Sequence, residues 1–463
     1  PLIWAFAASF LYWTYLFFTS TTPILFDCLD YQSLGRMIQE QGWTPYFETG
    51  PNREPIYPFI ISLSMSLAKL FSVPYLSIQK FIQLLFLFLT QILVLKILKS
   101  LKIRDIFCAI CILYLGFSPS LVNSALSLYS EVVAYPVILA VILFSCAALN
   151  NPLSSRKKLI VWGLLHGLAL IISTFIKGIF EIIAPLYLMV CAFITINPSM
   201  KKTPPLVINL LIFFMISFLT FSIPLTLYKS LNKKYNGSFS LTNRGAWALY
   251  GNTARRMDPL AMKNLSAAFL YAPGEGICKK FLDAETCRYW SFEQSDKLGY
   301  EKLAELRNQG ISNEDVDKRL IWGAFEQTMR NPFQYALFAG MEGLKMIFWE
   351  STQIGFVDYP DWLTTVFSFT PFKNSLRLII SLLTLSALFY CARFLWAHRK
   401  SAFPTENAPE QSVRILFCSL ALIVIYISLH SFFFILTRYA LPIAPLYLIL
   451  ITFSSDRIFL HKK

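Results

Sequence analysis

A dense polar segment lies between two apolar runs near the start of the chain: DCLDYQSLGRMIQEQGWTPYFETGPNREPIYP, residues 27–58. Its charged side chains are Asp27, Asp30, Arg36, Glu40, Glu48, Arg53 and Glu54. Binding and catalytic residues concentrate on loops that a rigid scaffold holds in place. We therefore expect chemistry in this segment and look to the rest of the chain for the scaffold.

The composition indicates a membrane protein. The chain has 463 residues, of which 56% are hydrophobic and 15% are charged, whereas soluble domains carry about 25% charged residues. Apolar runs near the ~20 residues that a helix needs to cross a bilayer recur along the chain. The sequence predicts an all-α polytopic membrane protein of about ten transmembrane helices.

The positive charge follows the membrane topology. The net charge of +14 comes from Lys and Arg gathered in short loops between apolar runs, as expected for loops on the cytoplasmic side. We therefore expect no nucleic-acid partner. The basic clusters that we place in the cytoplasm are 96–104, 156–158, 201–202, 398–400 and 461–463.

These markers put the first polar loop, 27–56, and the long polar segment 229–333 outside the cytoplasm. The short apolar stretches 56–71 and 333–349, the second with Glu342 and Lys345, are expected at the interface. The predicted spans are 2–22, 77–98, 105–123, 129–149, 159–175, 179–197, 205–228, 374–397, 414–434 and 438–455.

Three parts follow from this topology. They are an N-terminal transmembrane module with the first outer loop (1–228, loop 23–76), an extracytoplasmic α-containing insertion with an interfacial helix (229–373), and C-terminal transmembrane helices (374–463). The chain begins at Pro1 and not at Met, so we expect that an N-terminal piece precedes it.

The cysteines and histidines do not predict a metal site. Cys108 and Cys111 form a CxxC pattern inside an apolar run, where ordinary core cysteines are expected. The four His residues are far apart in sequence, which does not favour a metal centre. Cys278 and Cys287 share the outer segment, where a disulfide is possible but not readable from spacing.

The first candidates for catalysis are Asp27 and Asp30, just beyond the first span. A carboxylate at the rim of a low-dielectric wall has a raised proton affinity, which suits a general base. The alternative is that both are solvated loop acids.

Two arginines are candidates for binding an anion. Arg53 lies in REPIYP, where Pro55 and Pro58 stiffen the backbone, and a fixed guanidinium suits a phosphate. Arg438 opens the last span at its outer end, against the positive-inside trend. The alternative for both is anchoring at the membrane interface, with Tyr57 and Tyr439 as belt residues.

Glu131 begins a span, and acidic residues inside membranes are usually paired or functional. Lys177 lies on the same outer side and could meet an anionic lipid head. Because Lys177 and Glu181 are four residues apart, they could instead pair on one helix face.

Four pieces resemble one family when they are taken in order. They are DCLDYQSLGRMIQEQGW (27–43) with REPIYP (53–58), SLYSEVVAYP (127–136), LTNRGAWALYGNTARR (241–256) and TRYALPIAPLY (437–447). The set resembles the polytopic GT-C glycosyltransferases, the group that includes protein mannosyltransferases and aminoarabinose transferases, over nearly the whole chain.

The resemblance implies an inverting transferase that uses a polyprenyl-phosphate sugar on the outer face of a bacterial inner (plasma) membrane. It implies a lipid, glycan or protein acceptor, in the context of cell-envelope glycans. Asp27 matches the catalytic acidic position and Asp30 an acid sometimes seen nearby. The residues that it implies for substrate binding are Arg53, Tyr57, Glu131, Lys177, Arg244, Tyr250, Arg438 and Tyr439.

The sequence departs from the family at one position. Many members have Glu after the first Asp, whereas Cys28 follows Asp27 here. A divalent metal remains compatible with the resemblance, but not one that needs both acids. The single-base mechanism is unaffected.

Two other functions remain open at this stage. A transporter or lipid flippase explains the spans and Glu131 as part of a substrate path. A non-catalytic protein of GT-C-like architecture explains Cys28. A transferase predicts an outward cleft joining Asp27, Arg53 and Glu131, and a transporter predicts a site at the membrane midplane.

Overall fold

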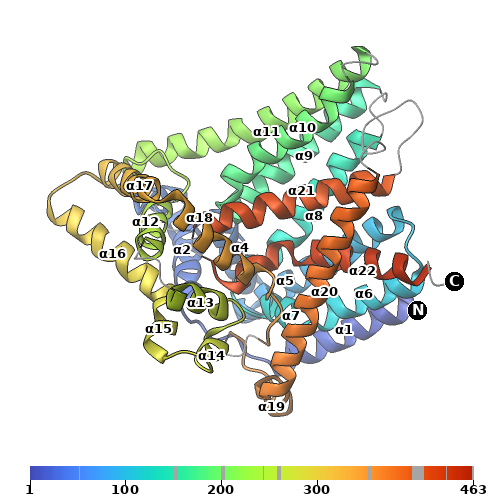
Figure 1. Cartoon of the computed structure of the whole chain (residues 1–463), viewed down its shortest axis with the longest axis horizontal. Helices are drawn as coiled ribbons and strands as arrows, with labels where there is room; N and C mark the ends of the chain where they lie inside the picture. Colours follow the sequence, from blue (N-terminus) through green and yellow to red (C-terminus); the bar gives the residue numbers. More distant parts are fainter. Residues whose placement is uncertain are drawn as a thin grey trace.

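The structure is a computed structural model, and it describes residues 1–51, 53–150, 155–199, 204–242, 244–257, 262–352, 356–398, 411–433 and 435–460. Within these ranges the protein is helical and has no β-strand; residues Thr21 and Asp358 form an isolated antiparallel bridge. The predicted all-α class is confirmed (Figure 1). The predicted basic residues 201–202, 399–400 and 461–463 lie outside the described ranges.

Eight described helical segments are long and apolar enough to cross a membrane. The number is nine if α6 and α7 together count as one span; they are bent by 48° at Ser118, where Pro119 starts the second helix. The eight are α1 (Leu2–Thr19), α5 (Tyr75–Ser100), α8 (Glu131–Asn150), α9 (Arg156–Ile176), α11 (Pro204–Asn236), α20 (Thr370–Ala397), α21 (Gln411–Phe432) and the Thr437–Phe459 segment, which is η2 (Thr437–Ile443) followed by α22 (Ala444–Leu460). The bent pair is α6 (Asp105–Phe117) and α7 (Pro119–Leu126).

The tenth predicted span corresponds to α10 (Phe180–Ser199), whose apolar part is shorter than the others. The stretch expected at the interface near 56–71 is α4 (Ile56–Phe71), an apolar helix of 16 residues that packs against α2 (Asp27–Gln41) and α5. Each of the ten predicted spans therefore has a helical counterpart.

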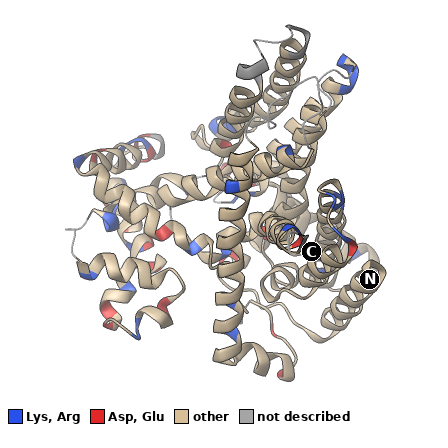
Figure 2. Cartoon of the chain, turned by 45° about the vertical axis from the view of Figure 1, so that its right-hand side comes forward, with Lys and Arg blue, Asp and Glu red and all other residues tan. Residues whose placement is uncertain are grey.

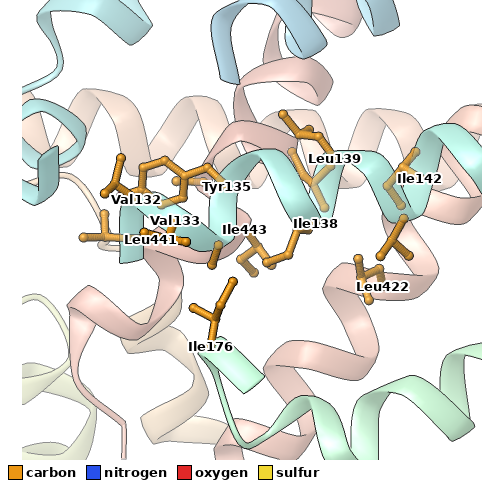
Figure 3. Close-up of a cluster of buried hydrophobic side chains, with 14 of the residues drawn as sticks. Val132, Val133, Tyr135, Ile138, Leu139, Ile142, Ile176, Leu422, Leu441 and Ile443 are labelled. Carbon is orange, nitrogen blue, oxygen red and sulfur yellow. The ribbon is translucent and has the colours of Figure 1, made fainter. Parts of the chain in front are cut away.

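Helix α8 is the centre of the spanning bundle. It packs against α5, α9, α21 and η2, and 72% of its apolar window is buried. Figure 3 shows Val132, Ile138 and Ile142 from α8 facing side chains that include Ile443 of η2 and Leu422 of α21. Because the outermost helix α1 has only 22% of its residues buried, its apolar side chains are left for lipid.

A compact helical insertion follows α11. Its elements are α12 (Gly245–Arg256), α13 (Met262–Tyr271), α14 (Glu275–Cys278), α15 (Ala284–Tyr289), α16 (Phe292–Asn308), α17 (Asn313–Arg330), α18 (Pro332–Gly343) and η1 (Leu344–Met346). Figure 2 shows many charged residues on this insertion and mostly uncharged ribbon along the spanning helices. Cys278 and Cys287, the pair left open by sequence, are joined by a disulfide between α14 and α15.

A buried ion cluster joins α12 to α18 and η1 within the insertion. Glu342 accepts hydrogen bonds from Arg255 at 2.5 Å, from Arg256 at 2.7 Å and from Lys345 at 2.9 Å, and its side chain is 0% exposed. We expected Glu342 and Lys345 to form the polar face of an interfacial helix, and this expectation was wrong. Glu342 can be buried because Arg255 and Arg256 of α12 neutralise its charge.

The fold places the first polar loop beside the last span. Lys80 of α5 donates to the carbonyl oxygens of Phe17 at 3.1 Å and Ser20 at 2.9 Å, which satisfies acceptors at the end of α1. The chain then enters α2 at Asp27. A short helix, α3 (Trp43–Glu48), leads back to α4, and α19 (Asp361–Ser368) precedes α20 near the same Thr21–Asp358 bridge.

Candidate active site

Asp27 is held by two arginines from distant parts of the chain. Its Oδ1 accepts from Nη2 of Arg53 at 2.6 Å, and its Oδ2 accepts from Nη2 of Arg438. The carboxylate stands in the first turn of α2, where the helix dipole also favours a negative charge. Its side chain is 21% exposed, so it faces a partly closed site and not bulk water.

Arg53 bridges the two carboxylates of α2. Its Nη2 and Nε donate to Oδ2 of Asp30 at 2.8 and 3.2 Å, and its guanidinium lies 5.2 Å from the ring centre of Tyr31. The Tyr46 hydroxyl donates to the Arg53 carbonyl at 3.0 Å and fixes the backbone there. Arg53 and the two acids, all predicted from sequence, are thus in direct contact.

Arg438 enters the site from η2, at the start of the last span. Its guanidinium lies 4.6 Å from the ring centre of Tyr129 and 5.8 Å from that of Tyr439. The hydroxyl of Tyr426 donates to the Tyr439 carbonyl at 2.8 Å, which holds the backbone next to Arg438. Arg438 is therefore a pairing partner of Asp27 in addition to any role at the interface.

The electrostatics of Asp27 differ from our expectation. Burial by itself would raise the pKa of Asp27, but the charges of Arg438 and Arg53, with the hydrogen bonds that they donate, outweigh burial and hold the pKa below its usual value. The predicted raised proton affinity was wrong for this state. Asp27 is ionised at neutral pH, and it is a weak base for as long as both guanidiniums stay on it.

A second ion pair lies beside the first. Nζ of Lys177 donates to Oε1 of Glu131 at 3.0 Å, and the Glu131 side chain is only 3% exposed. The predicted alternative, pairing of Lys177 with Glu181, was wrong: Glu181 accepts from Lys229 at 2.6 Å. The reason is that Lys177 ends α9 in extended backbone, so it shares no helix face with Glu181.

A small cavity connects the two ion pairs. It has a volume of about 10 Å³, which is room for about one water molecule. Four of the polar atoms in its lining residues are buried without a hydrogen-bond partner; they are Oγ of Ser127, the hydroxyl oxygen of Tyr129, Oε2 of Glu131 and Nε of Arg438. Its lining residues are Ser124, Ser127, Tyr129, Glu131, Phe356, Arg438 and Leu441.

A larger hollow lies elsewhere in the described part of the chain. An open hollow of about 960 Å³ is formed at the turn between α19 and α20. The residues that line it carry no charge, and none belongs to the Asp27 cluster; they are Thr364, Thr365, Val366, Ser368, Phe369, Pro371, Phe372 and Ser375.

Tyr57 contacts the site indirectly, through the ring of Tyr31. Its side chain is fully buried, its hydroxyl donates to Oε1 of Gln83 at 2.7 Å, and its ring meets that of Tyr31 edge-on at 4.8 Å. Because Tyr31 in turn lies under Arg53, Tyr57 acts on the site through packing.

Arg244 and Tyr250 are placed differently from the other predicted residues. Both belong to the start of the insertion, where the Arg244 guanidinium lies 5.9 Å from the Trp247 ring centre and Tyr250 packs beside Gly323 of α17. Within the described ranges, no hydrogen bond or ion pair joins either of them to Asp27.

Sequence reasoning missed two residues of α16. Asp296 is half-buried, and burial followed by the charges of Glu293 and Asp27 raises its pKa to about 6. Burial, followed by the charge of Asp296, raises the pKa of Tyr300. Their spacing of four residues puts them on one helix face, but nothing in the sequence links that face to α2.

The carboxylates of the cluster outnumber its cations. Asp27, Asp30, Glu131 and Glu54, which accepts from the backbone N–H of Gly178 at 2.7 Å, stand against Arg53, Lys177 and Arg438. In the part of the chain that the structure describes, no group of three or more His, Cys, Asp or Glu side chains could hold a metal ion. Cys28, which follows Asp27, is buried beside Tyr129.

Comparison with models of known protein families gives no match, and comparison with curated proteins gives none either. Among solved structures, the chain is similar to the archaeal oligosaccharyltransferase AglB from Archaeoglobus fulgidus, in complex with an inhibitory peptide and a dolichol-phosphate, with a TM-score of 0.44 and 11% identity. The match covers 94% of this chain and 46% of that one, so this chain spans less than half of its length. At this level of similarity, the geometry of the site is what supports a function.

Proposed function

We propose that the protein is an inverting glycosyltransferase, which moves a hexose or pentose from a polyprenyl-phosphate donor to an acceptor hydroxyl on the outer face of the membrane. The observation that carries the proposal is the pairing of Asp27 with both Arg53 and Arg438. A carboxylate that can accept a proton and two guanidiniums that fit a phosphate oxygen are thereby held together in one cluster.

The donor phosphate would compete with Asp27 for the guanidiniums. In the free protein, Arg53 and Arg438 are neutralised by carboxylates. A phosphate offers oxygens of the same geometry and at least one full negative charge, so it can draw either arginine away. Each guanidinium that leaves Asp27 raises the pKa of Asp27 toward that of a buried carboxylate, and donor binding thus turns Asp27 into a stronger base.

The chemical step then needs only groups that the proposal has named. Asp27 takes the proton of the acceptor hydroxyl as the oxygen attacks the anomeric carbon from the face opposite the phosphate. The bond between the anomeric carbon and the phosphate oxygen breaks, and its electron pair leaves with the polyprenyl phosphate. Arg53, Arg438 and Lys177 stabilise the charge that develops on the leaving group.

The position of the cluster favours a transferase over a transporter. Asp27 lies at the start of α2, Glu131 at the start of α8, Lys177 at the end of α9, and Arg438 in the first turn of the last span. Transporters of known architecture bind their substrates near the bilayer midplane, whereas these residues all occupy helix ends. The lipid tail of the donor would lie along the apolar surface of the bundle.

The test is transfer from a panel of lipid-linked sugars by the purified protein and by an Asp27→Asn variant. The expected result is transfer by the wild type, with inversion at the anomeric carbon, and a loss in the variant of at least the 10²-fold that a general base supplies. Asp105→Asn removes a carboxylate whose exposed partner is Lys99, and it should keep wild-type activity. Transfer by Asp27→Asn within threefold of the control would contradict the assignment.

A further inference from the structure

The small cavity between the two ion pairs has walls that are held in place. Oε1 of Glu131 accepts from Nζ of Lys177 at 3.0 Å, and the carbonyl oxygen of Ser127 accepts from Nε2 of Gln83 at 2.7 Å. Within the described part of the chain, Oε2 of Glu131 and Oγ of Ser127 have no hydrogen-bond partner, and the two residues are only 3% and 2% exposed. Because a buried polar atom without a partner is costly, we expect both atoms to bind a ligand in the cavity.

Arg438 and Tyr129 line the cavity on the side of the candidate active site. The Arg438 guanidinium lies 4.6 Å from the ring centre of Tyr129 and donates to Asp27 through Nη2. Nε of Arg438 and the hydroxyl oxygen of Tyr129 are buried, and neither has a hydrogen-bond partner among the described residues. The guanidinium that binds Asp27 through one nitrogen therefore has a second nitrogen available to a ligand of the cavity.

The size and the charge of the cavity favour one water molecule over an ion. The volume of about 10 Å³ is room for about one water. The lining includes one cation, Arg438, and one carboxylate, Glu131, so a bound cation would be repelled by the first and a bound anion by the second. A water molecule suits both, because it can accept from a guanidinium N–H and donate to a carboxylate oxygen.

We propose that this cavity binds one water molecule, which accepts a hydrogen bond from Nε of Arg438 and donates one to Oε2 of Glu131. The hydroxyls of Ser127 and Tyr129 are its other two partners, which completes the set that a buried water can satisfy. Through this water, Glu131 is a positioning residue that holds the Arg438 guanidinium while Nη2 exchanges Asp27 for the donor phosphate. The positioning role rests on the proposed function, whereas the water site does not.

The water matters at the step in which Arg438 changes its partner. In the free protein, the ion pair with Asp27 orients the guanidinium. When a phosphate replaces Asp27, the hydrogen bond from Nε through the water to Glu131 keeps the plane of the guanidinium, and with it the direction of Nη2. Because Lys177 holds the other oxygen of Glu131, the two cations that stabilise the leaving group are connected through one carboxylate.

X-ray radiolytic labelling in isotope-labelled water tests the site without turnover, because a buried side chain is oxidised where a bound water lies next to it. Tyr129 is 5% exposed and should be labelled in the wild type. Ser127→Val fills the cavity with methyl groups, and the label on Tyr129 should fall about fivefold once the water has no room. Tyr447 of α22 is fully buried and is not among the lining residues, so it should stay unlabelled.

Two labelling results would overturn the water site: equal labelling of Tyr129 and Tyr447 in the wild type, or equal labelling of Tyr129 in the wild type and Ser127→Val. An experimental density map of the wild type gives the same test without a variant. A peak within hydrogen-bond distance of Nε of Arg438 and Oε2 of Glu131 is expected. A map that shows other buried waters but no peak here would also overturn the site.

Transfer kinetics test the positioning role. Ser127→Val removes the water but leaves both ion pairs, so kcat should fall about tenfold, the effect of one lost hydrogen bond to a charged group, with an unchanged thermal midpoint. The same substitution in an Arg438→Lys background should change kcat less than about twofold, because lysine has no Nε–H group to position. An equal fall in both backgrounds, or no fall in either, would overturn the role.

A matched control is the same substitution at another buried serine. Ser419 of α21 is fully buried, its Oγ has no hydrogen-bond partner within the described ranges, and it does not line the cavity. Ser419→Val should leave kcat unchanged, and a fall equal to that of Ser127→Val would assign the effect to packing and overturn the role. Labelling and density need no turnover, so they decide the water site even if no lipid-linked sugar is transferred.

Discussion

Two ion clusters of the same protein, built from similar side chains, differ in how completely they are satisfied and enclosed. In the cluster around Glu342, one carboxylate serves Arg255, Arg256 and Lys345, and all four side chains are at most 4% exposed. In the cluster around Asp27, carboxylates outnumber cations, and the side chains of Asp27 and Asp30 are 21% and 40% exposed.

The difference separates a structural role from a functional one. A closed cluster cannot admit a ligand, and it stabilises the fold only while every charge keeps its partner. An open cluster beside a cavity with unpartnered atoms can exchange one partner for a substrate. On this comparison, Glu342 holds elements of the insertion together, and we assign Asp27 to the proposed site.

The largest expected effect is on the closed cluster. Glu342→Gln leaves two arginines and a lysine buried without their counter-charge, which should cost about 3–5 kcal/mol of stability. We expect a strong drop in the thermal midpoint of the purified protein in detergent or nanodiscs. A midpoint within 2 °C of the wild type would mean that the cluster is not a structural tie.

A smaller effect, on activity, is expected in the open cluster. Arg438→Lys keeps the positive charge but loses the flat fork that can hold Asp27 or a phosphate. Transfer should fall about 10²-fold, while the thermal midpoint changes little. Unchanged transfer would place Arg438 among the interface anchors, and a large loss of stability would assign it to the structural class with Glu342.

The half-buried Asp296 should give the opposite effect, because removing its charge is expected to increase the stability of the protein. The pKa of Asp296 is raised to about 6, first by burial and then by the charges of Glu293 and Asp27, so the folded state binds its proton more tightly than the unfolded state does. Its ionisation therefore lowers stability as the pH rises from about 4 through 6. Asp296→Asn should stabilise the protein at pH 7 by about 1 kcal/mol, after allowance for solvent screening.

The thermal midpoints at pH 4 and pH 7 check this effect. The gain should be present at pH 7 and absent at pH 4, where both the wild-type carboxyl and the amide are neutral. A gain that is equal at the two pH values would show that the change acts through packing and not through charge.

The smallest effect is expected for an exposed pair. Glu326 and Arg330 pair at 3.2 Å on α17, and their side chains are 57% and 71% exposed. Glu326→Gln should change stability by no more than about 0.5 kcal/mol, measured by the thermal midpoint. A loss of stability as large as that of Glu342→Gln would mean that burial does not explain how much an ion pair contributes.

The sequence predicted the spanning bundle well because apolar length is a local property. Ten apolar runs matched ten helical counterparts, including the short α10 and the bent α6–α7 pair. It also predicted that Asp27, Arg53 and Arg438 would come together, but this came from a family resemblance and not from the residues alone.

What the sequence could not predict depends on tertiary packing. The pKa of Asp27 is lowered because two guanidiniums reach it from Arg53 and Arg438, and no local pattern reveals such a contact. The partner of Lys177 is Glu131 and not Glu181, because the helix ends at Lys177.

The central claim is that a donor phosphate draws the arginines away and leaves Asp27 to accept the proton. The pH dependence of transfer tests it most directly, because kcat/KM reports ionisations of the free enzyme and kcat those of the donor complex. We predict that the acid limb of kcat lies at higher pH than that of kcat/KM. We also predict that Asp27→Asn abolishes the transfer activity in which this difference is measured. Acid limbs at the same pH, or one shifted to lower pH in the donor complex, would contradict the claim.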